Sequence, residues 1–343
     1  FIMKAYFYPP LFRKTKGVHN PYSKNFISSL SKHYKVNSKP AKTVGLLDLF
    51  CACFSTDIVI LNWVDNIAFK KMAYFQYILF NIILKILVMR NVCVVWVLHN
   101  IHPHKGENAL TNKINNLMCK YSDLVIVHSS EAKNYISRHT KAQVCFLHHP
   151  IEPIALDNQD SFNSCITFDF LIWGSIEPYK GILEFLQFCS NNKKVTADWR
   201  IKIVGLCKDK AYEEEVKKYI SPNVIYENRK IEFQELAKEI SLSQFVLFPY
   251  TSSSVSSSGA LMDSLALGAN IIGPSKGAFK DLAKNGICFV YESLEDLPNL
   301  KKRFSEINKT EIQFFVHKHS WDDFANNVSG LINTSINEKS KHE

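Results

Sequence analysis

Short runs of consecutive hydrophobic residues alternate along this chain with longer segments whose hydrophobic residues recur at helical spacing. A continuous run rich in β-branched and aromatic residues is typical of a strand buried on both faces. Strands that alternate with helices form parallel sheets covered by those helices, so the pattern predicts an α/β protein. The predicted strands are Asp57–Leu61, Val92–Leu98, Leu124–Val127, Val144–Leu147, Phe168–Trp173, Ile201–Val204, Asn223–Tyr226, Phe245–Phe248, Asn270–Ile272 and Cys288–Tyr291.

A polar, irregular stretch at residues 151–164 interrupts this alternation. The interruption predicts two Rossmann-like domains, residues 1–150 and 165–316, which are hinged at the linker between them. In such folds ligands bind beyond the carboxyl ends of the strands, so the residues that follow each strand are the candidates for a site. The chain after Thr334 is polar, which predicts a frayed end.

The segment Tyr74–Leu98 is apolar over nearly the length of a membrane-spanning helix. Lys85 and Arg90 interrupt it, however. Its first half has helical spacing, and its second half is a β-branched run that begins at Val92. We therefore predict a buried helix followed by a buried strand rather than a transmembrane helix.

The composition is that of a globular protein with two cores. Of the 343 residues, 46% are hydrophobic and 21% are charged, which excludes a disordered or collagen-like chain. Lys and Arg outnumber Asp and Glu by 41 to 32, and the net charge of +9 suits an acidic partner such as a phosphorylated ligand, an anionic membrane or nucleic acid. The positive charges form no blocks, so nucleic-acid binding is not predicted.

The nine cysteines are scattered, without a CxxC pair or the Cys/His spacing of a zinc site. This usage predicts reduced thiols in a cytoplasmic protein and no structural zinc. The opening residues, Phe1–Lys4, lack the basic region and long apolar core of a secretory signal, which agrees with that expectation.

A loop with a glycine at each end, Gly174–Gly181, follows the predicted strand Phe168–Trp173 and leads into an amphipathic helix. Free backbone N–H groups at a helix N-terminus favour anions, and Lys180 adds a positive charge. An ordinary joint between strand and helix, with a solvated lysine, is the alternative, since the loop has neither a GxGxxG pattern nor a Walker lysine.

A serine-rich loop follows Pro249-Tyr250 and ends at Ser258-Gly259, where a second helix begins. N–H and hydroxyl donors placed in this way can surround a diphosphate. Asp263, one turn into the helix, can reach a pair of ribose hydroxyls. A flexible serine linker is the alternative, but linkers do not belong between a strand and a helix of one domain.

His99 directly follows the predicted strand Val92–Leu98, where a ligand cleft would open. We predict that it contacts a ligand, whereas a structural role remains open for it and for its neighbours Asn100 and His104. Trp63 follows another strand, and either stacking on a ligand or packing in the core fits its position.

Together these segments resemble the GT-B glycosyltransferases of the retaining family-4 type over nearly the whole chain. Gly174–Gly181 resembles the loop whose lysine holds the donor diphosphate. The segment from Pro249 to Pro274 resembles the part of the family that carries an E-x7-E pattern. Gly17–Tyr22 resembles the loop after the first strand, and His99–His104 resembles the HN-x-x-PH segment of bacterial polysaccharide transferases.

The resemblance implies the GT-B fold, in which two Rossmann-like domains turn their parallel sheets toward each other across a cleft. A C-terminal helix at 317–336 would return to the N-terminal domain. Two positions depart from the family pattern. Val255 stands where the first Glu of E-x7-E is expected, with Asp263 in the second position, and Ser175 replaces an arginine that often follows the first glycine.

The resemblance also implies a function: transfer of a sugar from a nucleotide diphosphate sugar to a polysaccharide or lipid-linked oligosaccharide, with retention and without metal or cofactor. Helix N-termini and a lysine would stabilise the leaving diphosphate. Neither a D-x-D metal motif nor a glycosidase pair of carboxylates is evident. The residues implied are His99 and Lys180 for catalysis; Gly174, Ser175, Lys180, Tyr250, Ser258, Gly259 and Asp263 for the donor; and Asn20, Tyr22, Asn100 and His104 for the acceptor.

A lipid-linked acceptor suggests contact between the N-terminal domain and an anionic membrane, and the basic and aromatic residues from Tyr6 to Lys24 are candidates for that surface. An ordinary basic surface is the alternative. A non-catalytic subunit that binds nucleotide sugars also remains open, because of Val255 and Ser175. A nicotinamide-dependent oxidoreductase is not predicted, since its glycine fingerprint is missing.

Overall fold

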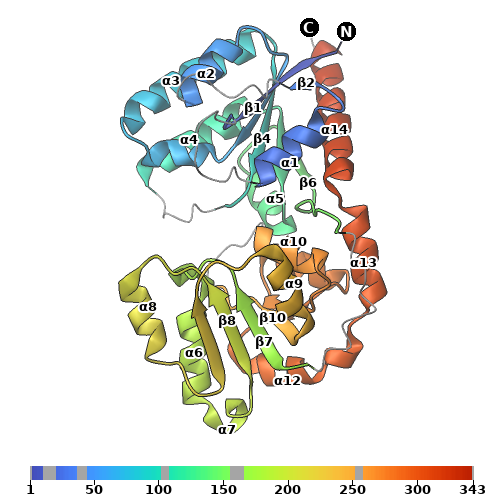
Figure 1. Cartoon of the computed structure of the whole chain (residues 1–343). Coiled ribbons are helices and arrows are strands. Elements are labelled where there is room, and N and C mark those ends of the chain that lie inside the picture. Colours follow the sequence, from blue (N-terminus) through green and yellow to red (C-terminus); the bar gives the residue numbers. More distant parts are fainter. Residues whose placement is uncertain are drawn as a thin grey trace. The chain divides into compact units, whose positions relative to one another are not determined.

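The computed structural model describes residues 2–10, 21–36, 45–101, 108–154, 166–251 and 258–341. These residues form two compact units, which Figure 1 shows in the colours of the sequence. Unit 1 contains the chain up to His148 together with the segment from Ser320 onward, and unit 2 runs from His149 to His319. Of the predicted linker 151–164, Ile151–Ile154 are described, and the backbone N–H of Ile151 donates to the carbonyl of His319 at 2.8 Å within unit 2.

The described residues of unit 1 build a six-stranded sheet with the order β2-β1-β3-β4-β5-β6. Every neighbouring pair is parallel, so each connection must cross over a face of the sheet. The strands are β1 (Lys4–Tyr8), β2 (Lys35–Val36), β3 (Ile58–Asn62), β4 (Cys93–Leu98), β5 (Leu124–Val127) and β6 (Gln143–Phe146), and the helices are α1 (Pro21–Leu30), α2 (Gly45–Ala52), η1 (Val64–Phe69), α3 (Ala73–Met89), α4 (Ala109–Tyr121), α5 (Ser130–Ile136) and α14 (Trp321–Lys341).

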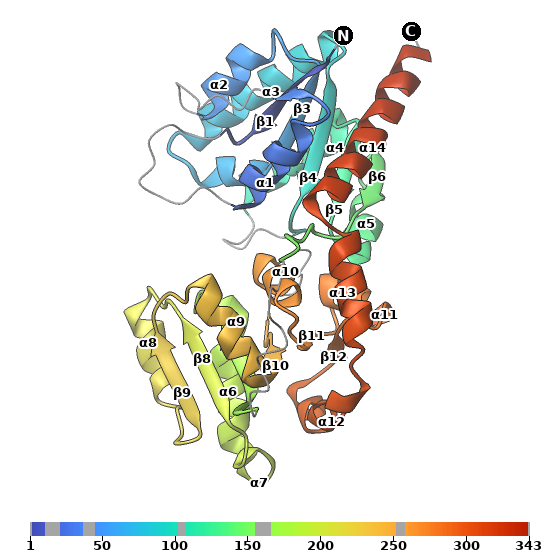
Figure 2. The same ribbon diagram turned by 45° about the vertical axis from the view of Figure 1, so that its right-hand side comes forward.

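Alternate residues of these strands point to opposite faces of the sheet, as strand geometry requires. Tyr6 and Tyr8 belong to a core shared with α2, α3, α4 and α5, whereas Ala5 and Phe7 belong to a core shared with α1 and α14. Because both faces are covered, β3 and β4 are buried throughout, which explains their uninterrupted hydrophobic runs. Helices α1 and α14 lie side by side although they come from opposite ends of the chain (Figure 1; Figure 2).

The described residues of unit 2 build a second parallel six-stranded sheet, with the order β12-β11-β10-β7-β8-β9. Helices α9, α10, α11 and α13 pack in the core on one face, and α6, α8 and α12 pack on the other. The strands are β7 (Phe168–Trp173), β8 (Ile201–Gly205), β9 (Val224–Asn228), β10 (Ser243–Leu247), β11 (Ile271–Pro274) and β12 (Phe289–Tyr291), and the helices are η3 (Pro178–Lys180), α6 (Ile182–Asn191), α7 (Lys193–Thr196), α8 (Lys210–Lys217), α9 (Phe233–Ser241), α10 (Gly259–Ala266), α11 (Gly277–Lys284), η4 (Leu294–Asp296), α12 (Leu297–Lys302), η5 (Phe304–Glu306) and α13 (Lys309–Lys318).

These sheets confirm the α/β prediction, and each predicted strand is present with ends shifted by at most two residues. Leu124–Val127 and Phe168–Trp173 match without a shift. β1 and β2 are additional strands that the predicted set lacks. β1 is built mainly from aromatic rather than β-branched residues, and β2 has only two residues, so neither produces a long β-branched run.

The last helix, α14, continues to Lys341, so the prediction of a frayed end after Thr334 is wrong. Ser335 is buried, and the Lys339 ammonium lies 2.7 Å from the Asp123 carboxylate. The same ammonium donates to the carbonyl of Val92 at 3.2 Å. The polar composition could not reveal these contacts, because the partners of Lys339 lie far away in the sequence.

The segment Tyr74–Leu98 forms helix α3 and strand β4, as predicted, but only one face of α3 is buried. Phe80, Ile83, Leu84 and Leu87 face the core. Other apolar side chains of the helix, such as Ile78, are exposed, so the prediction of a buried helix is wrong for its outer face. No described helix has both the length and the apolar character needed to cross a membrane.

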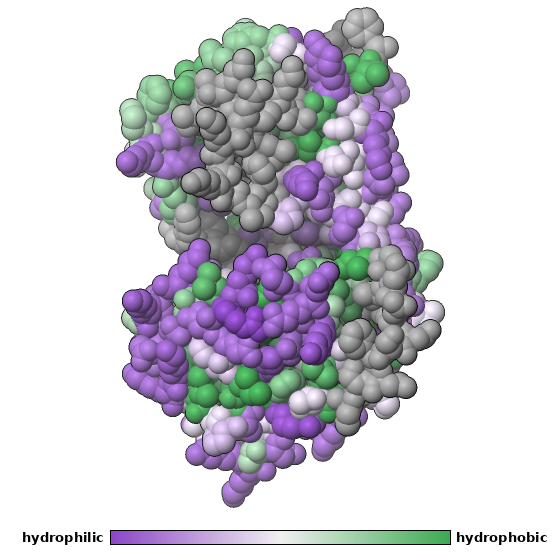
Figure 3. Space-filling view, viewed as in Figure 1, coloured by the Kyte–Doolittle hydropathy of each residue, from purple (hydrophilic) through white to green (hydrophobic). Residues whose placement is uncertain are grey.

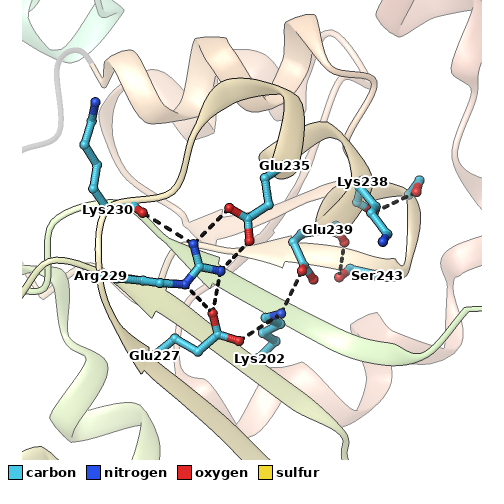
Figure 4. Close-up of polar contacts among 9 residues, drawn as sticks. Lys202, Glu227, Arg229, Lys230, Glu235, Lys238, Glu239 and Ser243 are labelled. Carbon is cyan, nitrogen blue, oxygen red and sulfur yellow. Dashed lines mark hydrogen bonds and ion pairs between the residues drawn. The ribbon is translucent and has the colours of Figure 1, made fainter.

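A network of ion pairs joins β8, β9 and α9 in unit 2 (Figure 4). The buried Lys202 ammonium lies 2.7 Å from the Glu239 carboxylate and 3.2 Å from that of Glu227. The Arg229 guanidinium pairs with Glu227 at 2.6 Å and also with Glu235. Burying a lysine without a partner is costly, so these carboxylates allow Lys202 to occupy a buried position. The network thereby fastens α9 to the sheet.

Candidate functional site

The two loops singled out in the C-terminal half of the sequence lie together in unit 2. The loop after β7 and the loop after β10 are joined where the Thr251 backbone N–H donates to the Tyr179 carbonyl at 3.1 Å. The Tyr179 and Tyr250 rings meet edge to face, with centroids 6.1 Å apart. Parallel strands end at the same edge of a sheet, so these loops meet beyond the carboxyl ends of neighbouring strands β7 and β10.

Lys180 is buried between these loops, with 7% of its surface exposed. Its Nζ lies 5.8 Å from the centre of the Tyr250 ring and close to the backbone of Gly174, where an added Cβ would lie 3.1 Å away. In the described part of the chain, no carboxylate lies within 4.0 Å of this ammonium. Burial lowers the pKa of Lys180 to about 8, against an opposing effect of Glu177.

Glycines allow the loop after β7 to approach its neighbours closely. Gly174 has a φ of +101°, which favours glycine, and its N–H donates to the Val204 carbonyl at 3.2 Å. Gly181 has a φ of +67°, and a Cβ added there would lie 1.9 Å from the Pro249 carbonyl oxygen. The loop that carries Lys180 is therefore held in place by backbone packing against the loop after β10.

Helix α10 begins beside Tyr250. The Ser258 hydroxyl caps the helix by accepting the Leu261 N–H at 3.3 Å, and its oxygen also lies 3.3 Å from the Tyr250 hydroxyl. Gly259 is the first residue of the helix, and among the described residues a Cβ added to it would meet no atom within 4 Å beyond its chain neighbours and its own helix. The first N–H groups of a helix have no partner inside it, so this terminus offers donors to an anion.

Asp263 lies one turn into α10 and is exposed. Desolvation nevertheless raises the pKa of its carboxyl to about 6, so the group is mostly ionised at neutral pH. Trp173, which the sequence did not single out, fixes this helix to the end of β7 because its indole N–H donates to the buried Ser264 hydroxyl at 2.8 Å. The sequence could have pointed to Trp173, because it is the last residue of a predicted strand and directly precedes the glycine loop.

Within unit 2 the structure thus brings together Gly174, Lys180, Tyr250, Ser258 and Gly259. Ser175 is exposed next to Gly174. The middle of the serine-rich loop, 252–257 with Val255, lies outside the described residues. The described residues hold no group of three His, Cys, Asp or Glu side chains that could bind a metal ion.

In unit 1, His99 is buried at the end of β4 and stacks on Trp63, with ring centroids 4.3 Å apart. Its Nε2 lies 3.1 Å from the Asn62 Oδ1. The amide nitrogen of Asn62 donates to the Tyr8 carbonyl at 3.2 Å, which leaves Oδ1 as an acceptor. His99 Nε2 therefore carries a proton, and in the neutral ring the basic nitrogen is Nδ1.

Tyr22 packs edge to face on His99, with centroids 4.7 Å apart. Its hydroxyl lies 3.2 Å from Nε2 of His128, a residue that the sequence analysis missed. His128 Nδ1 donates to the Leu147 carbonyl at 2.9 Å, so in the neutral ring Nε2 accepts from Tyr22. His128 directly follows β5, as His99 follows β4. The rule that pointed to His99 could therefore have found it.

Of the other residues that the sequence analysis predicted for unit 1, only Asn100 lies in the described part of the chain. Asn100 is half-buried and lines a small cavity together with Trp63 and His99. Asn20 and His104 lie outside the described residues.

Trp321 of α14 packs against Tyr22 with ring centroids 5.1 Å apart. Helix α14 therefore contributes to the cluster of aromatic side chains around Tyr22 and His99.

No protein-family model and no curated protein matches this sequence, but solved structures resemble its fold over nearly its whole length. Sucrose-phosphate synthase from Thermosynechococcus elongatus is 13% identical, with a TM-score of 0.66 over 96% of this chain and 98% of that one. The lipopolysaccharide outer core galactosyltransferase WaaB is 14% identical, with a TM-score of 0.63 over 98% and 100%.

HepE of Anabaena, solved in complex with UDP-glucose, is 13% identical to this chain, with a TM-score of 0.57 over 99% of this chain and 100% of that one. At such identities the likeness concerns the fold alone. These proteins are GT-B glycosyltransferases, and their architecture agrees with the two parallel six-stranded sheets described above. The chain therefore has the GT-B fold, as its sequence predicted.

Proposed function

We propose that this protein is a glycosyltransferase that moves a sugar from a nucleotide diphosphate sugar to a saccharide or lipid-linked saccharide acceptor. The observation that carries the proposal is the buried ammonium of Lys180, which has no carboxylate partner in the described residues. It lies near the backbone of Gly174 and 5.8 Å from the centre of the ring of Tyr250, whose hydroxyl lies 3.3 Å from that of Ser258, the residue that caps α10. A buried cation of this kind needs an anion. A diphosphate supplies one, and the α10 terminus can share it.

Two further points support this choice of ligand. The pattern of motifs resembles donor-binding loops of the family, and solved structures of the same fold include one in complex with UDP-glucose. A diphosphate also explains Gly259, which stands at the start of α10, because a residue without a side chain lets a phosphate approach the backbone N–H groups of the helix terminus closely. Asp263 would receive the ribose hydroxyls.

The same residues account for a transfer reaction. Breaking the bond between the anomeric carbon and the diphosphate oxygen leaves negative charge on the diphosphate. Lys180 and the N–H groups at the start of α10 are held in place before the reaction, so they stabilise that charge without reorganising. We further propose retention of configuration and no requirement for metal, as the family resemblance implies.

Proton uptake on nucleotide binding tests the proposal. Free Lys180 has a pKa of about 8, and a bound diphosphate favours the charged form and raises that pKa. Binding at pH 8 should therefore take up roughly half a proton, and affinity should fall as the pH rises through 8. Calorimetry of UDP, GDP and ADP in buffers with different ionisation enthalpies measures the uptake, with and without EDTA.

Two variants serve as controls. Lys180→Arg keeps a charge that does not titrate in this range, so it should bind without proton uptake. Lys230→Ala removes an exposed lysine of the same unit and should change neither affinity nor uptake. If no nucleoside diphosphate binds, or if uptake persists in Lys180→Arg, the proposal is wrong. Loss of binding in EDTA would overturn metal independence.

A pair of glycine variants locates the diphosphate. Gly259→Ala adds a methyl group that, among the described residues, contacts nothing within 4 Å outside its own helix and chain neighbours, so stability should be retained while UDP affinity falls. Gly181→Ala should instead destabilise unit 2 by about 3 kcal/mol or more. Residue 181 has a left-handed φ, and the added Cβ would collide with the Pro249 carbonyl. Thermal unfolding and UDP titration separate the two effects. Unchanged UDP affinity in Gly259→Ala would place the diphosphate elsewhere.

For unit 1 we propose that His99 acts on the transferred sugar or the acceptor, with Tyr22, Asn100, Asn20 and His104 in acceptor binding. His99→Gln is then expected to reduce transfer far more than UDP affinity. Glutamine retains a donor for Asn62, so packing changes less than it does with alanine. Steady-state kinetics and UDP titration measure the two quantities. Near-normal transfer by a folded His99→Gln protein would show that His99 is structural.

A further inference from the structure

The outward side of α3 carries an apolar stripe on the surface of unit 1. Phe75, Ile78, Ile82, Lys85 and Met89 follow one another at intervals of three or four residues, so they share one side of the helix. The apolar members are 58%, 55%, 45% and 86% exposed, in that order. We name these five residues the α3 outer face. Helices on protein surfaces normally turn a polar side to water, and this one does not.

The outer face belongs to a larger patch. Single exposed hydrophobic residues are common on proteins, but clusters of them mark interaction sites. Of the 16 exposed large hydrophobic residues in the described part of the chain, nine lie between residues 47 and 89. Figure 3 shows hydrophobic residues gathered over α2 and α3 at the upper left. The nine are Leu47, Phe54, Met72, Tyr74, Phe75, Ile78, Ile82, Val88 and Met89.

The charge around this patch is mainly positive. Residues 66–100 contain Lys70, Lys71, Lys85 and Arg90 and no Asp or Glu, and the preceding acid, Asp65, is half-buried in η1. The nearest acid of α2, Asp48, accepts a hydrogen bond from the Tyr6 hydroxyl at 2.7 Å, so it is turned toward the sheet. The patch therefore combines exposed apolar side chains with an excess of positive charge.

We propose that the α3 outer face docks on the anionic headgroup region of a lipid bilayer. Apolar side chains enter the interface while lysines bind the anionic headgroups, which is how interfacial helices bind. A second copy of this chain fits less well, because a two-fold dimer through this face would bring Lys85 and its neighbours against their own copies. Docking rests on unit 1 alone and is independent of the proposed reaction.

This surface replaces the one suggested by the sequence between Tyr6 and Lys24. Tyr6, Tyr8 and Tyr22 are buried, so they cannot meet a membrane. Residues 11–20 lie outside the described part of the chain. Most of the exposed large hydrophobic residues described in unit 1 lie instead between residues 47 and 89, on or beside α2 and α3.

Vesicle co-sedimentation of the full chain tests the proposal. The protein should bind vesicles that contain phosphatidylglycerol, bind pure phosphatidylcholine weakly, and dissociate as salt increases. Replacing Ile78 and Ile82 together by Glu should lower the affinity by about tenfold or more. Replacing Lys71 and Lys85 by Gln should lower it by about fivefold for each charge.

Phe314→Glu is the matched control, because Phe314 is an equally exposed hydrophobic residue of unit 2, with 64% of its surface accessible. It should leave vesicle binding unchanged. UDP titration and circular dichroism of each variant show that the rest of the protein is intact. Absence of binding to anionic vesicles overturns the proposal. So does a dimer in analytical ultracentrifugation that the Ile78/Ile82 variant dissociates, since that result assigns the face to a second copy.

Discussion

Replacing Lys180 by alanine is expected to lower the rate of sugar transfer by about 10²–10³, which corresponds to about 3–4 kcal/mol of transition-state stabilisation. The ammonium lies in a loop that backbone contacts hold in place, and in the proposed reaction its interaction with the diphosphate would strengthen as the anomeric bond breaks. An interaction that strengthens only in the transition state lowers the turnover number rather than raising the Michaelis constant. Lys180 makes no ion pair in the described structure, so the variant should fold.

The measurement is sugar transfer from UDP-sugars and GDP-sugars to saccharide and lipid-diphosphate acceptors, with circular dichroism as the check on folding. Lys230→Ala, at an exposed position, should keep full activity. Unchanged turnover in Lys180→Ala would remove this lysine from the mechanism. If the wild-type protein binds nucleotides but transfers no sugar across the panel, it is the non-catalytic binding subunit that the sequence left open at Val255 and Ser175.

Replacing Lys202 by alanine is expected to lower the stability of unit 2 by about 3 kcal/mol, the lower end of the range for breaking a buried ion pair. The side chain lies between Glu227 and Glu239, and Glu239 is itself buried. Without the ammonium, Glu239 becomes a buried charge that has lost its partner. Glu227 keeps its pair with Arg229, which limits the loss.

Hydrogen exchange of the amides in β8 and α9 measures this effect inside unit 2, where a single unfolding temperature for a chain of two units would not. The double variant Lys202→Met with Glu239→Leu removes both charges and should recover most of the lost stability. Lys217→Ala removes an exposed lysine that pairs with the exposed Glu214 and the half-buried Glu213, so it should change exchange far less than Lys202→Ala does. Equal exchange in Lys202→Ala and the wild type would show that the network does not hold α9.

The order of strands along the chain and the fold class follow from the sequence because both depend on local periodicity. A strand covered on both faces must be apolar at every position, and that requirement appears directly in Val92–Leu98 and Phe168–Trp173. The same rule placed Gly174, Lys180 and His99 at strand ends. The sequence analysis did not select His128 or Trp173 as site residues, although the same rule applies to both, because each stands at or next to the end of a strand.

Long-range packing could not be predicted in the same way. The sequence could not show which side of α3 is exposed, because the helix is apolar all round and has no polar side to mark the surface. It could not show that the polar end of α14 is held by Asp123, or that Tyr22 meets His128. These contacts join residues far apart in the chain, and hydrophobic spacing carries no information about them.

The sequence by itself therefore determined the alternation of strands and helices, the two parallel sheets and the loops in which to look for a site. Only the tertiary structure decided that Lys180 is buried beside Gly174 and Tyr250, that His99 is stacked on Trp63, and that the α3 outer face remains exposed. The physical reason is that periodicity records how each segment is divided between core and surface. The burial of a charge depends instead on which segments the fold brings together.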